Sequence, residues 1–220
     1  MKADRAVNFF YRCDTVKREE KNQQTKRRIM DSALAEFSKQ GYGASSVNTI
    51  CAAQDLSKGI IYHDFKTKDY LYLACVEECF ELLTQYLKSC LSEEKISTEE
   101  QLEKYFAVRM NFFQEKPVYQ PIFCEAVVSP PAHLKAEINA RKQAFNALNA
   151  EILEKLIQPL PLRPKVTKAE VVDVFRQFQD VINAKYRIAG ISEQEFELRD
   201  ESCRKALNIL LYGIIERKGD

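Results

Sequence analysis

From Ala44 to Lys68 the chain reads ASSVNTICAAQDLSKGIIYHDFKTK, and this stretch decides the fold that the sequence predicts. It predicts a short helix from about Val47, a tight turn at Asp55 and a second short helix after Ser57. Lys68 then stands in the first turn of the helix that follows. Two short helices joined by a tight turn form a helix-turn-helix, a motif that lays its second helix in the major groove of DNA. The stretch therefore indicates a DNA-binding module.

Serines stand at the start of both short helices. Ser45 or Ser46 can cap the first helix and Ser57 the second, because a serine hydroxyl accepts a backbone N–H group that a helix start leaves without an intrahelical partner. A hydroxyl at a helix N-terminus also suits a phosphate. Asp55 falls where a left-handed backbone is expected, and Asp tolerates that conformation better than most residues.

The second short helix is expected to have a buried side and an exposed side. Ile61 and Phe65, four residues apart, are expected to point into the core. The residues expected on the exposed first turn or near the groove and the DNA backbone are Lys58, Gly59, Ile60, Tyr62 and His63. Two alternatives stay open, namely a plain helical hairpin in an all-α core and a core position for Tyr62.

Residues 28–71 resemble the tetracycline-repressor (TetR) family of bacterial regulators. The resemblance covers about a fifth of the chain and rests on Ile29, Ala33, Phe37, Gly41, Tyr42, Ser46, Val47, Ile50, Leu56, Ser57, Lys58, Gly59, Ile61, Tyr62, Phe65, Lys68 and Leu71. Asp55 stands where the family usually has Gly, and Asp64 where it favours an aromatic residue or His. Because a carboxylate repels a DNA phosphate, Asp64 is left out of the predicted DNA-binding set.

The resemblance implies an all-α fold of about nine helices, with a three-helix DNA-binding head followed by a helical body. Family members bind operators as homodimers, hold a small molecule in the body and dimerise through the last two helices. The resemblance also implies that Tyr62 and Lys68 contact phosphates, and that residues 58–60 lie against the groove. The predicted DNA-binding residues are Ser45, Ser46, Ser57, Lys58, Gly59, Ile60, Tyr62, His63 and Lys68.

Helix signals recur along the chain and support the all-α class. Three capping boxes, in which a Ser or Thr and a Glu satisfy the N–H groups of a helix start, precede apolar periodic stretches. They are Ser97/Glu100, Thr167/Glu170 and Ser192/Glu195. Besides the two short helices of the motif, the expected helices are 25–40, 67–91, 98–115, 118–128, 132–158, 168–188 and 193–217. Gly41 stands where the first of them is expected to end in a left-handed residue.

The sequence predicts three segments: a leader at 1–24, a helix-turn-helix domain at 25–68, and a ligand-binding and dimerisation domain at 69–220. The leader could be a basic arm that reaches a minor groove, an extension of the first helix or a mostly disordered segment, and a partly helical leader is favoured. The last helix carries an apolar stripe wider than one neighbour covers, which predicts a homodimer interface. The stripe includes Leu207, Leu211, Ile214 and Ile215.

Composition favours a globular protein of the cytoplasm. The net charge is +1, with +4 over residues 1–70 and −3 over the remainder, a basic head on an acidic body. The seven cysteines are odd in number and form no CxxC pair, which argues against a disulfide framework or a zinc ribbon. The N-terminus has no signal-peptide pattern, and no apolar run approaches the roughly 18–20 residues that span a bilayer, so no membrane partner is expected.

The body is rich in aromatic residues, which could line a cavity for a small apolar or amphipathic ligand. The candidate pocket residues are Tyr105, Phe106, Met110, Phe113, Tyr119, Phe123, Phe175 and Phe178. The carboxylates of Glu115 and Glu125 and the hydroxyl of Tyr119 are candidate polar groups. Cys75 and Cys79, four residues apart, suit either a metal or thiol sensor or plain core packing, and core packing is favoured.

The expected function is that of a ligand-responsive transcriptional regulator, most simply a repressor, that a small molecule releases from double-stranded DNA. The alternative is a DNA-binding protein of the same type without an inducer, in an architectural or division-linked role. No enzyme activity, cofactor or metal is expected, because the sequence offers no nucleophile–base pair, metal cluster or phosphate loop. Only His63 and His133 could supply an imidazole.

Overall fold

The computed structural model describes residues 3–55, 57–91, 97–185 and 193–214. Within these ranges it contains ten α-helices, one short 3₁₀ helix and no strand, so the all-α prediction is confirmed. The chain divides into two compact units. We refer to Met1–Cys75 as the head and to Val76–Asp220 as the body. None of the described helices is both long and apolar enough to cross a membrane.

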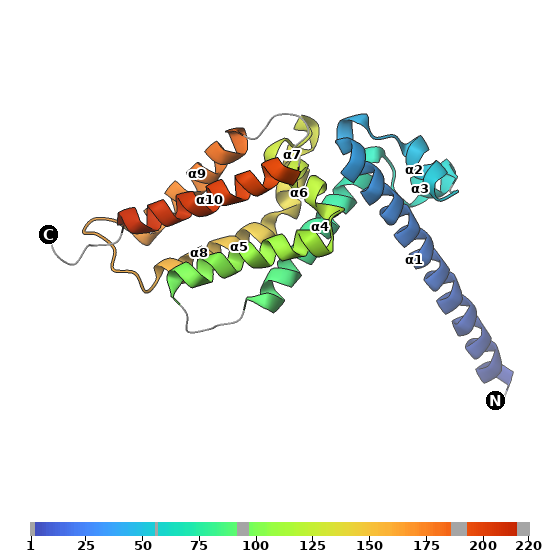
Figure 1. The fold of residues 1–220 in the computed structure, drawn as a ribbon. Helices are drawn as coiled ribbons and strands as arrows, with labels where there is room; N and C mark the ends of the chain where they lie inside the picture. Colours follow the sequence, from blue (N-terminus) through green and yellow to red (C-terminus); the bar gives the residue numbers. More distant parts are fainter. Residues whose placement is uncertain (1–2, 56, 92–96, 186–192, 215–220) are drawn as a thin grey trace. The chain divides into compact units, whose positions relative to one another are not determined.

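The head contains α1 (Ala3–Ala44), α2 (Val47–Ala53), α3 (Lys58–Asp64) and the start of α4 (Lys68–Cys90). The first half of α1 extends away from α2 and α3 (Figure 1), so the predicted leader is an extension of the first helix. Apolar side chains from all four helices form one buried core. Its main members are Ile29, Ala33, Phe37, Ile50, Ile61, Phe65, Leu71 and Tyr72.

Gly41 interrupts α1 close to the predicted end of the first helix. Its φ of 70° and ψ of 172° are non-helical, and the backbone turns there before a short last turn reaches Ala44. This combination of angles is accessible almost only to glycine. The expected left-handed residue is therefore present, and it redirects the chain towards α2.

The body comprises the remainder of α4 together with α5 (Thr98–Glu115), α6 (Tyr119–Val128), the 3₁₀ helix η1 (Ala132–Leu134), α7 (Lys135–Arg141), α8 (Gln143–Ile157), α9 (Lys168–Lys185) and α10 (Glu193–Ile214). The helix expected at 132–158 is divided at Lys142, which raises the number of α-helices from nine to ten. Two of the three predicted capping boxes are present, at Ser97 and at Thr167. Ser192, of the third, lies outside the described residues.

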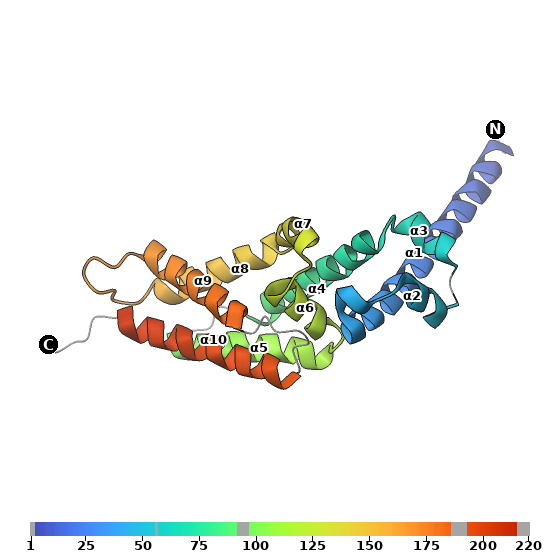
Figure 2. The same cartoon turned by 90° about the horizontal axis from the view of Figure 1, so that it is seen from above.

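Four body helices pack in a ring, in which α5 contacts α8, α8 contacts α9, α9 contacts α10, and α10 contacts α5. Figures 1 and 2 show α9 beside α10 from two directions. A second group of side chains, from α4, α5, α6 and α8, forms a buried aromatic cluster with ring centroids 5.1–6.1 Å apart. We call this group the aromatic cluster, and it comprises Phe80, Phe112, Phe113, Tyr119, Phe123 and Phe145.

Candidate nucleic-acid interface and ligand cavity

Side-chain caps position both helices of the predicted DNA-binding motif. The hydroxyl of Ser46 accepts the N–H of Asn48 at 3.1 Å, and the Ser46 N–H donates to the Glu36 carboxylate at 3.2 Å. The hydroxyl of Ser57 accepts the N–H of Ile60 at 3.4 Å and so caps α3. Serines at these two positions therefore determine where each helix begins, as the sequence predicts.

The turn between α2 and α3 is held by residues that sequence reasoning did not select. Asp55 adopts the expected positive φ of 51°. Arg28 donates from Nη2 to the carbonyl of Gln54 at 2.7 Å, and the buried Ser32 donates to the carbonyl of Ile50 at 2.8 Å. Both bonds satisfy carbonyl groups at the C-terminal end of α2, and both link residues at least 18 positions apart.

The outer side of α3 is exposed to solvent. Ile61 and Phe65 are buried as expected, whereas Tyr62 is 46% exposed, which excludes a core position for it. The remaining candidates on this side, Ser57, Lys58, Gly59, Ile60 and His63, are exposed as well. The Asp64 carboxylate lies 2.9 Å from Nδ1 of His63. The structure thus brings together, on one short helix, a cation, an aromatic ring, an apolar side chain and an imidazole.

Ser45 has a different environment from the other candidates. It is buried, and its hydroxyl donates to the carbonyl oxygens of Glu36 and Gly41 in α1. These contacts stabilise the end of α1, and they leave the Ser45 side chain away from the exposed side of α3.

Lys68 also has a structural contact. Its ammonium donates to the carbonyls of Tyr42 at 2.6 Å and Ser45 at 3.0 Å, and it lies 4.3 Å from the centroid of the Tyr42 ring. The hydroxyl of Tyr42 in turn donates to Asp69, next to Lys68 in α4. Because an ammonium has three N–H donors, these two bonds leave one for a phosphate. Lys68 therefore joins α4 to the end of α1 in addition to its predicted role.

The ring of four body helices encloses a cavity of about 30 Å³. Side chains from all four helices line it: Leu102, Tyr105, Phe106, Arg109, Asn149, Ile152, Leu153, Leu156, Phe175 and Leu207. Three of the eight predicted pocket residues are among them, namely Tyr105, Phe106 and Phe175. The Tyr105 hydroxyl donates to Oδ1 of Asn149 at 2.7 Å. Arg109, which sequence reasoning missed, is the charged side chain in this set.

The other five predicted pocket residues lie elsewhere in the body. Phe113, Tyr119 and Phe123 belong to the aromatic cluster, where they pack against other rings. Met110 and Phe178 are half-buried and are not among the residues that line the cavity. The aromatic spacing on a helix predicted burial for most of these residues, but it could not separate cavity walls from solid core.

The proposed polar groups are occupied by contacts with α4. The Tyr119 hydroxyl donates to the Glu78 carboxylate. Glu115 accepts a hydrogen bond of 2.8 Å from the Tyr86 hydroxyl, and this bond raises the pKa of Tyr86 to about 12. These pairs join α5 and α6 to α4 and so serve packing within the body.

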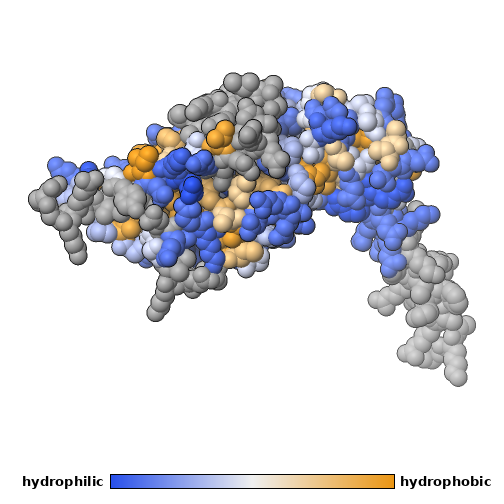
Figure 3. Space-filling model, in the orientation of Figure 1, coloured by the Kyte–Doolittle hydropathy of each residue, from blue (hydrophilic) through white to orange (hydrophobic). Residues whose placement is uncertain are grey.

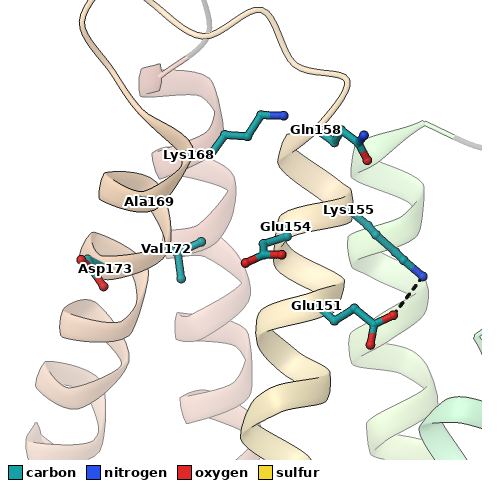
Figure 4. Close-up of a pocket in the computed structure, with 8 residues that line it drawn as sticks. All are labelled: Glu151, Glu154, Lys155, Gln158, Lys168, Ala169, Val172 and Asp173. Carbon is teal, nitrogen blue, oxygen red and sulfur yellow. Dashed lines mark ion pairs between the residues drawn. The ribbon is translucent and has the colours of Figure 1, made fainter.

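A larger groove of about 540 Å³ lies between α8 and α9. Figure 4 shows its walls, where Lys155 pairs with Glu151 at 3.2 Å and Lys168 and Gln158 lie near the open end of the two helices. Glu154, Ala169, Val172 and Asp173 complete the lining. Walls of mixed charge are typical of a solvated surface and differ from the mostly apolar walls of small-molecule sites.

The two cysteines of α4 that suggested a sensor are buried in the core. Cys75 and Cys79 are fully buried, and the Cys79 thiol donates to the carbonyl of Tyr119 at 3.7 Å. Among the described residues, no group of three or more His, Cys, Asp or Glu side chains is placed to hold a metal ion. Their environment is that of the core-packing alternative.

Comparison with known proteins gives two family matches. Residues 29–75 match the family described as bacterial regulatory proteins, tetR family, and residues 96–214 match the tetracyclin repressor-like C-terminal domain. The second match alone covers more than half of the chain. The first lies wholly within the head and the second wholly within the body.

Two curated relatives are similar over the N-terminal region. The biofilm operon negative regulator IcaR of Staphylococcus epidermidis is 29% identical over 62 residues, or 28% of this chain, and the repressor DhaR of a Mycobacterium species is 28% identical over 79 residues, or 36% of this chain. The matches span only 34% and 40% of the length of these relatives. Among solved structures, the transcriptional regulator FadR of Bacillus subtilis, in complex with stearoyl-CoA, has the same fold. Its TM-score is 0.63 at 17% identity, with 86% of this chain and 99% of FadR covered.

Proposed function

Because the chain belongs to the TetR family of bacterial regulatory proteins, we propose that it is a ligand-responsive transcriptional regulator, most simply a repressor. It binds a near-palindromic operator as a homodimer, and a small apolar or amphipathic inducer releases it. The heads of the two protomers each read one half-site, about one helical turn of DNA or slightly more apart.

The exposed side of α3 is the observation that carries the proposal. Lys58, Ile60 and Tyr62 are exposed although the helix is capped by Ser57 and anchored by buried Ile61 and Phe65. A short rigid helix with such a surface suits insertion into a major groove. Lys58 and the remaining N–H donor of Lys68 supply positive charge for phosphates.

Exposed apolar side chains on the last two helices support the homodimer. Val174 on α9 and Leu198 and Ile209 on α10 are exposed, and Ile209 is 71% exposed. Leu207, of the predicted stripe, is buried within its own chain, where it lines the cavity. The side chains of Leu211 and Ile214, and all of Ile215, lie outside the described residues. Hydrophobic residues also reach the surface of the body elsewhere (Figure 3).

The cavity among α5, α8, α9 and α10 is the proposed inducer site. Pockets of this kind form between the helices of bundles, and the related fold of FadR holds stearoyl-CoA, an amphipathic molecule. Since α4 begins in the head and ends in the body, it is the element through which the inducer would act. The inducer must bind the DNA-incompetent state more tightly, because a ligand shifts an equilibrium only through such a difference.

Selection of DNA from a random duplex library by the full-length protein tests the proposal. We expect enrichment of a near-palindrome and binding of two protomers per site. Apolar and amphipathic compounds that raise the melting temperature of the protein should also lower its affinity for the selected DNA, since the two effects are reciprocal. Failure to enrich any duplex would refute the DNA-binding function.

The small size of the cavity favours a second candidate, a DNA-binding protein of the same family without an inducer. About 30 Å³ holds only one or two water molecules, and the aromatic cluster beside it is filled by its own rings. In that case the protein would bind many sites in an architectural or division-linked role. Selected DNA together with a compound screen in which nothing raises the melting temperature would support this candidate over the first.

A further inference from the structure

We propose that the cavity at the centre of the four-helix ring binds an amphipathic anion, with its carboxylate on Arg109 and its apolar chain among the surrounding side chains. This inference rests on the proposed function, because it names the chemical class of the inducer. It also makes Arg109 the residue that selects anions over neutral molecules of the same size.

The position of Arg109 is unusual for a charged side chain. The residue is only 5% exposed, yet its guanidinium lies among apolar walls, with the ring centroid of Phe106 at 5.0 Å and that of Tyr105 at 5.6 Å. Leu102, one helical turn before Phe106, and Leu207 of α10 line the same cavity. A cation over aromatic faces is favourable, but burial away from water is costly unless charge and hydrogen bonds compensate.

A carboxylate that enters the cavity meets a set of donors that suits it. The guanidinium carries five N–H donors in a planar fork, whose geometry matches the two oxygens of a carboxylate. None of the described side chains that line the cavity is itself a carboxylate. The amide of Asn149 can add a further N–H donor, since its Oδ1 already accepts the Tyr105 hydroxyl at 2.7 Å. The site therefore combines a cation and an amide at one end with apolar walls.

The apolar walls determine the rest of the ligand. Ile152, Leu153 and Leu156 follow one another along α8, and Leu102 faces the same cavity from α5. The present volume of about 30 Å³ matches a head group and not a chain. Entry of a chain must therefore displace side chains. Phe175 on α9 is half-buried and lines the cavity, so it is the side chain that would move first. Such a displacement of α9 gives the ligand a route to alter the body.

A pair of chain-matched probes tests the inference on the full-length protein. Decanoate and decanol have the same number of carbons, and decanol is the more apolar. We expect wild-type protein to bind decanoate at least about tenfold more tightly than decanol by calorimetry, as for a hydrogen-bonded charge. Arg109→Met should reverse this preference. Arg204→Met removes an arginine that pairs with Glu103 at 2.6 Å, outside the cavity, and should keep the preference for decanoate.

A spectroscopic measurement on wild-type protein covers the case in which Arg109→Met does not fold. The carboxyl carbon of ¹³C-labelled decanoate should titrate at a lower pH when bound than when free, because the guanidinium stabilises the ionised form. A bound carboxylate that titrates as in water, or wild-type protein that prefers decanol, would overturn the inference. So would an Arg109→Met variant that keeps the preference for decanoate.

The failure of this inference can be told apart from failure of the proposed function. If decanol or another neutral compound raises the melting temperature and releases DNA from both wild type and Arg109→Met, the inducer function stands and the anion site is wrong. If neither probe binds, the anion site is also wrong. If, in addition, no compound in the screen binds while selected DNA does, the inducer function falls with it and the candidate without an inducer remains.

Discussion

At the scale of single residues, polar side chains of the head serve the fold and the DNA surface together. Lys58 is exposed on α3, whereas Lys68 is tied to two carbonyls at the end of α1. Both lysines were selected from the motif for the same reason, positive charge near a phosphate. Their surroundings now separate them, because only one of the two has hydrogen bonds that the folded head needs.

A matched pair of variants should show this separation. Lys68→Ala should weaken binding to all DNA sequences alike and also lower the melting temperature, because the carbonyls of Tyr42 and Ser45 lose their donor. Lys58→Ala should reduce the salt slope of DNA binding by about one unit with little change in stability. Lys88→Ala, an exposed lysine of the body, is the control. A melting temperature unchanged by Lys68→Ala would contradict the structural role.

The capping box of α9 should make stability depend on pH. Hydrogen bonds from the Thr167 N–H and hydroxyl, both at 2.8 Å, lower the pKa of Glu170 below 4.5. Because the folded pKa is lower than the unfolded one, the stabilisation is present above the unfolded pKa and is lost as the pH falls through the folded one. Glu170→Gln should therefore destabilise at pH 7 and lose its effect in acid. Thermal melts between pH 7 and pH 3 measure this, with Glu154→Gln, in the middle of α8, as control.

At the scale of elements, the parts of the fold that the sequence predicted are those with local signals. Ser46, Ser57 and Ser97 cap helices as expected, and Gly41 and Asp55 adopt positive φ. The break at Lys142 was missed because it has neither a proline nor a glycine.

Residues far apart in the chain account for most of what the sequence could not predict in the candidate site. Arg28 reaches Gln54, Lys68 reaches Tyr42, and Tyr105 reaches Asn149, over 26, 26 and 44 positions. Such pairs depend on how helices pack, which periodicity within one helix does not encode. The same reason explains why Arg109 was missed: only the meeting of four helices makes its position a cavity wall.

Two glycines of α1 provide a test at the scale of the element. Gly41 has a φ of 70°, so Gly41→Ala should destabilise the head by about 1–3 kcal/mol through backbone strain. Gly43 is two residues further on, and a methyl group there meets no other atom within 4 Å. Gly43→Ala should therefore be neutral or slightly stabilising, since alanine restricts the unfolded chain. Urea unfolding of both variants compares them, and equal destabilisation would disprove the role of Gly41.

At the scale of the whole molecule, the proposed operator requires two copies of the chain. Leu198 and Ile209 are eleven residues apart on α10, about three helical turns, so they share a face. Both are more than half exposed, at 52% and 71%. An exposed apolar face on a terminal helix is typical of an interface, whereas Leu207 is buried within its own chain. Removal of α10 by truncation after Ser192 should accordingly yield monomers or insoluble protein, and a soluble dimer would place the interface elsewhere.

A single charge on the same face provides a milder test. Ile209→Glu should give folded monomers, because a dimer would have to bury an unpaired carboxylate. Light scattering after size-exclusion chromatography measures the mass. A monomer carries one head, so its affinity for the full operator should fall to that for an isolated half-site, while half-site binding stays as in wild type. Ala136→Glu adds the same charge at an exposed position on α7 and should remain dimeric. If Ile209→Glu binds the full operator as tightly as wild type does, α10 does not form the interface and the two heads are joined by another surface.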